Sequence, residues 1–172
     1  MRKFMVALGA ALLLALSIDV AAGASPTTVA VRGGERFVPN AMIQSTFHFS
    51  PGPISVSSGQ EITWVDEGQI ADPHTITVVA ELPATLDEVF GCQDPGPPPQ
   101  PCAVALAGHF PNPPAPPVPV LNAGAPGLDA PGDSLLLAPD GSVSAVVSAP
   151  AGTTLLYLCA IHPWMQGSIT VG

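Results

Sequence analysis

The sequence predicts an all-β fold, and two observations support this prediction. Of the 172 residues, 22 are Pro and 17 are Gly, so turns must be frequent, and only 10 % are charged, which is too few for helices covered with surface ion pairs. Short segments that alternate polar and apolar residues, or that are rich in β-branched residues, also recur along the chain. The length suits one domain with a core of its own.

The expected strands are separated by turn signals. In residues 61–66, polar and apolar residues alternate as in a half-buried strand, which places Ile62 and Trp64 together on the core face. Another begins at His74 and consists mainly of β-branched residues. The strands are expected at residues 28–31, 37–49 (long and irregular), 61–66, 74–79, 142–147, 153–159 and 167–171.

Residues 81–140 differ from the rest of the chain and are interpreted as a Pro/Gly-rich insertion. The insertion starts with a short helical turn at residues 85–90. Residues 119–131 alternate Pro, Gly and small residues without a periodic apolar pattern, so we expect them to run over the surface and to form no second core.

The N-terminus has the three parts of a secretory signal. Arg2 and Lys3 form a positive start, residues 4–16 are apolar, and residues 22–24 are small, as cleavage positions require. This pattern predicts a signal peptide at residues 1–24 and one mature domain at residues 25–172, secreted or periplasmic. The alternative is an uncleaved anchor, although the apolar run is shorter than the roughly 20 residues of a membrane-spanning helix.

The charge of the chain limits its partners. Four Lys and Arg residues against 13 Asp and Glu give a net charge of −9. Nucleic acids are usually held through Lys and Arg, so the composition argues against nucleic-acid binding. A protein partner with a basic surface is favoured instead, and the domain is expected to be a monomer.

The chain has three cysteines, an odd number that leaves at least one unpaired within an exported chain. Cys92 and Cys102 flank a Pro-rich turn, and in an oxidising compartment they are expected to close a small loop as a disulfide. Cys159 is then a free thiol. The commoner fate of a free cysteine is a buried, unreactive position, but the neighbours of Cys159 point to a ligand.

Cys159, His162 and Met165 recur at every third position between two apolar strands. A loop between neighbouring strands can bring these three side chains to one point. His74, at the start of its strand, can add a second imidazole. Two His, one Cys and a weak axial Met form the donor set of electron-transfer copper sites. Zinc is the alternative metal, but Met is a poor zinc ligand.

The pattern Cys-x2-His-x2-Met followed by Gly and a short strand, with an upstream His before Thr-Ile-Thr-Val, resembles the plastocyanin/azurin family of cupredoxins. The ligand loop is most similar to that of amicyanin. The resemblance covers about residues 29–79 and 143–171. It implies a Greek-key β-sandwich with one type 1 (blue) copper ion, held by His74, Cys159, His162 and Met165.

Two features depart from the family pattern. The distance along the chain from His74 to Cys159 is longer than usual, which we attribute to the insertion. Thr75 stands where plastocyanins often carry Asn, so the side-chain bracing between the ligand loops is in question, although the backbone N–H of Thr75 can still donate to the Cys sulfur.

The function expected from this resemblance is the transfer of single electrons between redox partners outside the cytoplasm, not an enzymatic activity. Electrons are expected to pass at the edge of His162, beside Ile161, Pro163 and Trp164. Two alternatives stay open: a copper carrier or storage protein that uses the same ligands, and an interaction module that uses the Pro-rich insertion.

Other candidate residues receive ordinary roles. His48 and His109 have no Cys or Met nearby, so both are expected to be ordinary surface or partly buried histidines. The acidic residues are scattered, no nucleophile accompanies them, and they are expected to form a solvated surface. These residues are Asp66, Glu67, Asp72, Asp87, Glu88 and Asp94.

Overall fold

The computed structural model describes residues 27–94, 101–121 and 127–172. The signal peptide predicted at residues 1–24 therefore lies outside the described residues. In the described ranges, no helix has the length and hydropathy of a membrane span.

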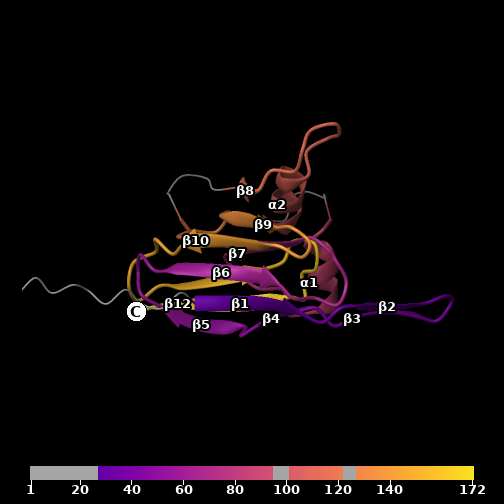
Figure 1. Cartoon of the computed structure of the whole chain (residues 1–172), viewed down its shortest axis with the longest axis horizontal. Helices are drawn as coiled ribbons and strands as arrows, with labels where there is room; N and C mark the ends of the chain where they lie inside the picture. Colours follow the sequence, from indigo (N-terminus) through magenta and orange to yellow (C-terminus); the bar gives the residue numbers. More distant parts are fainter. Residues whose placement is uncertain (1–26, 95–100, 122–126) are drawn as a thin grey trace, which may run out of the picture.

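Two β-sheets pack face to face (Figure 1). The four-stranded sheet has the order β10-β6-β1-β4, and the six-stranded sheet has the order β5-β12-β11-β7-β9-β8. Their strands are β1 (Thr27–Arg32), β4 (His48–Ser50), β5 (Pro53–Val56), β6 (Glu61–Asp66), β7 (His74–Val79), β8 (Val120–Leu121), β9 (Ser134–Leu137), β10 (Ser142–Val146), β11 (Thr154–Leu158) and β12 (Gln166–Val171).

The chain crosses repeatedly between the two sheets. Strand β4 lies in the four-stranded sheet, β5 in the six-stranded sheet, β6 in the first again and β7 in the second. Neighbouring strands therefore come from distant parts of the chain, as in the parallel pairs β1–β6 and β5–β12. The predicted fold class, a Greek-key β-sandwich, is confirmed.

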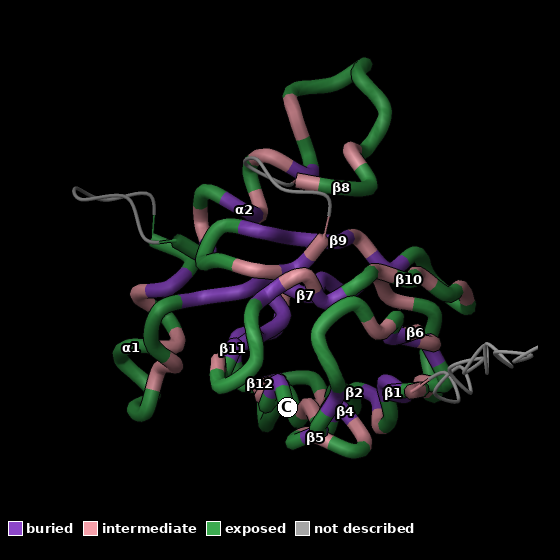
Figure 2. The backbone as a smooth tube through the Cα atoms, turned by 90° about the vertical axis from the view of Figure 1, so that its left-hand side faces the viewer, coloured by how far each residue is buried: buried purple, intermediate pink, exposed green. Residues whose placement is uncertain are grey.

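The core lies between the sheets, where buried positions of both face each other (Figure 2). Ile62 and Trp64 are both 0 % exposed, as their shared face predicted. The ring of Trp64 meets that of Tyr157 from the other sheet edge-on, with centroids 6.1 Å apart, and Phe49 lies 5.0 Å from Tyr157. These aromatic contacts join the two sheets around one centre.

Gly167 on β12 is required by the approach of Tyr157. These two residues are cross-strand partners, and a Cβ atom at position 167 would overlap the phenol ring. Since the ring is fully buried, it has little room to move away. We expect Gly167→Ala to lower the free energy of unfolding by about 1–3 kcal/mol, the usual cost of overpacking. Denaturant unfolding measures this loss. The control must be a glycine whose backbone accepts a side chain, which excludes Gly59 because of its positive φ. Gly91, with no atoms within 4 Å of such a Cβ, serves instead.

The irregular strand expected at residues 37–49 is in fact a hairpin followed by β4. Strands β2 (Glu35–Val38) and β3 (Met42–Ser45) pair with each other and extend away from the sandwich (Figure 1). Asn40 turns the chain between them at a φ of 59°, a left-handed conformation that Asn tolerates well. The side chains of Phe37 and Ile43 are 70 % and 72 % exposed.

The insertion contains more regular structure than the sequence predicted. The expected helical turn at residues 85–90 is present as α1 (Leu86–Gly91), which a capping box between Thr85 and Glu88 starts. A second helix, α2 (Pro101–His109), and the short strands β8 and β9 were not predicted, and neither was β5, which lies before the insertion. Leu128, from the expected surface segment, is 1 % exposed and belongs to the main core.

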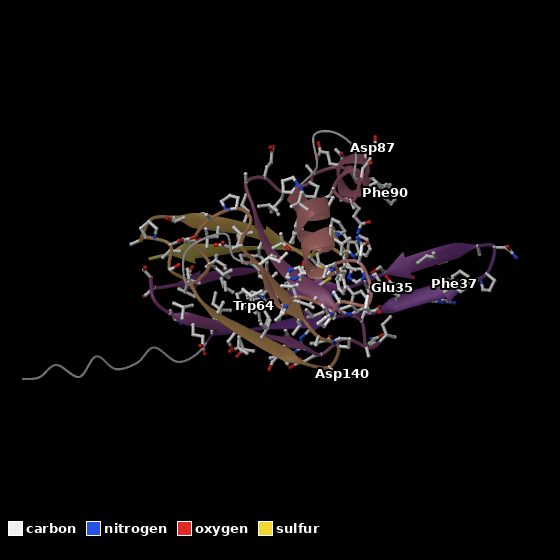
Figure 3. All side chains as sticks on the ribbon, turned by 90° about the horizontal axis from the view of Figure 1, so that it is seen from above. Glu35, Phe37, Trp64, Asp87, Phe90 and Asp140 are labelled. Carbon is white, nitrogen blue, oxygen red and sulfur yellow. A yellow bond between two sulfur atoms is a disulfide. The ribbon has the colours of Figure 1, made fainter. Side chains whose placement is uncertain are left out.

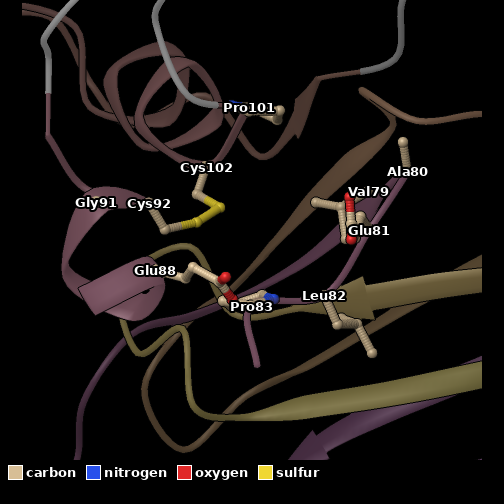
Figure 4. A pocket seen from close by; sticks show the side chains of 10 residues that line it. All are labelled: Val79, Ala80, Glu81, Leu82, Pro83, Glu88, Gly91, Cys92, Pro101 and Cys102. Atoms are coloured by element: carbon tan, nitrogen blue, oxygen red, sulfur yellow. A yellow bond between two sulfur atoms is a disulfide. The ribbon is translucent and has the colours of Figure 1, made fainter. Parts of the chain in front are cut away.

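A second apolar cluster connects the insertion to the sandwich. It joins α1 and α2 to the outer face of β7 and to the residues around Cys159, and it includes the disulfide between Cys92 and Cys102, as predicted (Figure 4). Its buried members are Val79, Cys92, Cys102, Ala105, Leu158 and Ala160.

Candidate metal centre

The four predicted ligands come from two neighbouring parts of the six-stranded sheet. His74 is the first residue of β7, and Cys159 directly follows the last residue of β11. Since β7 and β11 are antiparallel, the start of one lies beside the end of the other. His162 and Met165 lie in the loop that leads from Cys159 into β12. Strand pairing therefore brings these distant positions to one end of the sandwich.

Three of the ligand atoms form a small triangle. The Cys159 sulfur lies 3.9 Å from His74 Nδ1 and 3.8 Å from His162 Nδ1, and the two nitrogens are 3.3 Å apart. The point equidistant from these atoms is about 2.1 Å from each, close to the metal–nitrogen and metal–sulfur bond lengths of about 2.0–2.3 Å. The three residues thus have the geometry of a metal site.

The fourth residue, Met165, is placed by its backbone. The N–H of Cys159 donates to the carbonyl of Met165 at 3.0 Å, and the N–H of Met165 donates to the carbonyl of His162 at 2.8 Å. The loop is therefore a closed turn with Met165 packed in the same core as Cys159. A thioether beside two imidazoles and a thiolate is a donor set suited to copper.

The site is buried except for one edge. His74, Cys159 and Met165 are 0 % exposed, whereas His162 is 8 % exposed. The ring of Phe47 covers both imidazoles, with centroids 4.8 Å from His74 and 5.1 Å from His162. Figure 3 shows the hairpin leaving this end of the molecule, with Glu35 near the sandwich and Phe37 further out.

Two backbone N–H groups point at the sulfur. Thr75 donates to Cys159 Sγ at 3.3 Å, as the sequence predicted, and His162 donates at 3.4 Å. The side chain of Thr75 also accepts a hydrogen bond from the N–H of Ala160 at 2.7 Å. Thr75 therefore braces the two ligand segments, which resolves the question raised by the missing Asn.

Burial controls the protonation of the ligands. It raises the pKa of the Cys159 thiol, an effect that the hydrogen bonds from Thr75 and His162 oppose. Burial lowers the pKa of His74 to about 4, with the nearby His162 as a further cause, and burial also lowers the pKa of His162. Both imidazoles are therefore neutral at pH 7, as metal binding requires.

The insertion holds the ligand loop from outside, a contact that the sequence did not reveal. Gln93, next to the disulfide, donates from Nε2 to the carbonyls of Ala160 at 3.2 Å and Ile161 at 2.6 Å. On the other side of the loop, Gln166 Nε2 donates to the carbonyl of Pro83 at 2.8 Å. Both glutamines join the ligand loop to the segment around α1.

The structure corrects the role expected for one acidic residue. Asp66 is 8 % exposed rather than solvated, and its carboxylate accepts the N–H groups of Gly68 and Asp140, each at 2.9 Å. Asp66 thus fixes the loop between β6 and β7 that leads to His74. Glu67 forms a surface ion pair with Arg32 at 2.7 Å.

The fold and the clustered donors resemble those of the cupredoxins, the class of β-sandwich proteins with type 1 copper sites. The sandwich provides a rigid support at one end. The triangle of His74, Cys159 and His162, with Met165 in the same loop, provides the candidate ligands. The structure thus agrees with the resemblance seen in the sequence.

Comparison with known proteins gives similarities to solved structures alone. No protein-family profile and no curated protein sequence matches the chain. Auracyanin A from Chloroflexus aurantiacus is 20 % identical, covering 86 % of this chain and 100 % of its own, with a TM-score of 0.45. A purple cupredoxin from Nitrosopumilus maritimus is 16 % identical (85 % and 99 % covered, TM-score 0.43), and plastocyanin from Dryopteris crassirhizoma is 23 % identical (85 % and 100 % covered, TM-score 0.40).

Proposed function

We propose that the protein is a blue copper protein that carries single electrons between redox partners outside the cytoplasm. His74, Cys159, His162 and Met165 would hold the copper ion. The triangle of the two Nδ1 atoms and the sulfur, sized for a metal ion, is the observation that supports this function most directly. Bound copper would supply the one-electron couple.

The surroundings of the ligands support electron transfer over catalysis. Because three of the proposed ligands are fully buried and the fourth is 8 % exposed, the described residues leave a substrate little access to the metal position. The ligand loop is held by its own backbone hydrogen bonds and by Gln93, so the ligands need little rearrangement when the charge of the ion changes. A small structural rearrangement between the oxidised and reduced states favours fast electron transfer.

The exposed edge of His162 is the proposed electron port. The ring of Trp164 lies 5.3 Å from that of His162 and is 42 % exposed, so an apolar surface adjoins the ligand. A redox partner can approach such a surface without removing tightly bound water. The net charge of −9 favours a partner with a basic surface.

Two observations support a location outside the cytoplasm. Residues 2–24 have the composition of an export signal. The Cys92–Cys102 disulfide is of the kind that persists in oxidising compartments.

The visible absorption and electron paramagnetic resonance of the Cu(II)-loaded protein test this proposal. An intense thiolate-to-copper band and a narrow copper hyperfine splitting are expected in the wild type and absent in Cys159→Ser. His48→Gln, which changes an exposed histidine, is expected to keep both signals. Colourless wild-type protein, or a spectrum unchanged in Cys159→Ser, would contradict the proposal.

The same sample separates an electron carrier from a copper carrier. An electron carrier is expected to be reduced and reoxidised repeatedly with copper retained in both states. Release of the metal on reduction to a strong Cu(I) chelator at equal concentration would favour the copper carrier.

A further inference from the structure

We propose that buried polar side chains below the site form a directed hydrogen-bond chain that sets the reduction potential of the copper. The chain runs from Thr75 through Thr77 and Ser134 to His109, which acts as a positioning residue. This inference rests on the function proposed above.

The members of the chain are close together and shielded from water. Thr75 Oγ1 lies 2.9 Å from Thr77 Oγ1, which lies 2.8 Å from Ser134 Oγ, and that atom lies 2.8 Å from His109 Nε2. Each of the four residues is at most 1 % exposed. They come from β7, β9 and α2, so the chain joins the ligand strand to the insertion.

The two ends fix the direction of the chain. The N–H of Ala160 can only donate, so Thr75 Oγ1 accepts it at 2.7 Å. At the other end, the carbonyl of Val118 can only accept, so His109 Nδ1 carries a hydrogen. Burial lowers the pKa of His109, which leaves the ring neutral and makes Nε2 an acceptor.

Each hydroxyl then donates its hydrogen to one defined partner. Ser134 donates to His109 Nε2, Thr77 donates to Ser134, and Thr75 donates to Thr77. Hydrogen bonds aligned in this way polarise and strengthen one another. The chain therefore directs the hydroxyl hydrogen of Thr75 toward Thr77.

This direction matters because Thr75 lies beside the ligand sulfur. Its backbone N–H already donates to Cys159 Sγ at 3.3 Å, and its hydroxyl accepts the N–H of Ala160, the residue that directly follows that ligand. The hydroxyl thus lies between its acceptor Thr77 and the ligand segment that carries the sulfur. Hydrogen bonds at the Cys sulfur tune the potential of such copper sites. A further donor would draw negative charge from the sulfur and favour the reduced ion, so an intact chain keeps the potential lower.

Thr77→Val removes the first acceptor of the chain with little change in shape. The hydroxyl of Thr75 is then expected to turn to the sulfur and to shift the electron equilibrium with a reference couple about tenfold toward the reduced protein, which is ~59 mV for one electron. Thr77→Ser is expected to restore the wild-type potential. Thr63→Val is the control, because it makes the same substitution in a hydroxyl pair of similar length, Thr63–Ser144 at 2.8 Å, at an exposed position on the other sheet.

The metal-free wild-type protein gives a second readout that needs no variant in the chain. Nitrogen NMR of His109 is expected to show the tautomer with hydrogen on Nδ1, and the amide of Ala160 is expected to exchange slowly with solvent. Hydrogen on Nε2 would overturn the proposed direction.

The outcomes distinguish this inference from the proposed function. If the thiolate-to-copper band is present in the wild type and in all three Thr variants, yet Thr77→Val has the potential of Thr63→Val, the directed chain is wrong and the copper site stands. If the wild type shows no such band, the proposed function fails and the inference fails with it.

Discussion

Replacing Cys92 and Cys102 together by Ala is expected to lower the free energy of unfolding of the metal-free protein by about 3 kcal/mol. The disulfide closes a loop with a sequence separation of 10, and in the chain-entropy description a crosslink of this size restricts the unfolded chain by about that amount. Both sulfur atoms also pack in the cluster that includes Leu158 and Ala160, on either side of Cys159. Guanidinium unfolding followed by circular dichroism measures the loss.

The reduced wild-type protein is the control for this experiment. Reduction breaks the crosslink but keeps the sulfur atoms, so its stability is expected to lie near that of the double variant. A loss below about 1 kcal/mol, well under the usual effect of a disulfide, would mean that the insertion unfolds separately from the sandwich. In that case Gln93 would not hold the ligand loop under the same conditions.

The proposed copper ligands could be identified from the sequence because three rare donor types lie close together in it. Cys159, His162 and Met165 share one loop, and the strand that starts at His74 has a clear β-branched pattern. The strands with alternating patterns were predictable for the same reason: their periodicity is a local property. Ile62 and Trp64 lie on the core face as that periodicity requires.

The elements that sequence reasoning missed lack such a local pattern. Strand β9 has the sequence Ser-Leu-Leu-Leu, which is neither alternating nor β-branched. Its extended conformation is decided by its pairing with β7. Helix α2 begins at Pro101, a residue favoured in the first turn of a helix, but the Pro-rich surroundings masked that signal.

His109 shows why the roles of single residues were harder to predict. In the sequence it has no neighbouring Cys or Met, so it was expected to be an ordinary histidine. In the structure it is 0 % exposed and both ring nitrogens are hydrogen-bonded, to Val118 and Ser134. These partners meet only because β9 pairs with β7 beside α2. Asp66 is similar, since its two backbone donors are brought to it by folding.

Lowering the pH from about 7.5 to 4.5 is expected to destabilise the metal-free protein progressively. Burial lowers the pKa of His74 to about 4 and also lowers the pKa values of His109 and His162. The unfolded chain takes up these protons near the ordinary pKa of about 6.5, whereas the folded protein does so only at lower pH. The unfolded state thus binds more protons in this window, and His74 alone accounts for a loss of up to about 3 kcal/mol.

Urea unfolding at several pH values measures this loss, and two variants identify its source. His74→Gln is expected to flatten the pH dependence because it removes the most strongly shifted group, whereas His48→Gln, at an exposed position, is expected to leave the slope unchanged. Copper loading is also expected to flatten the wild-type profile, since a bound metal excludes the proton from its ligands. Parallel profiles for the metal-free wild type and His74→Gln would show that His74 takes up its proton equally in the folded and unfolded chains.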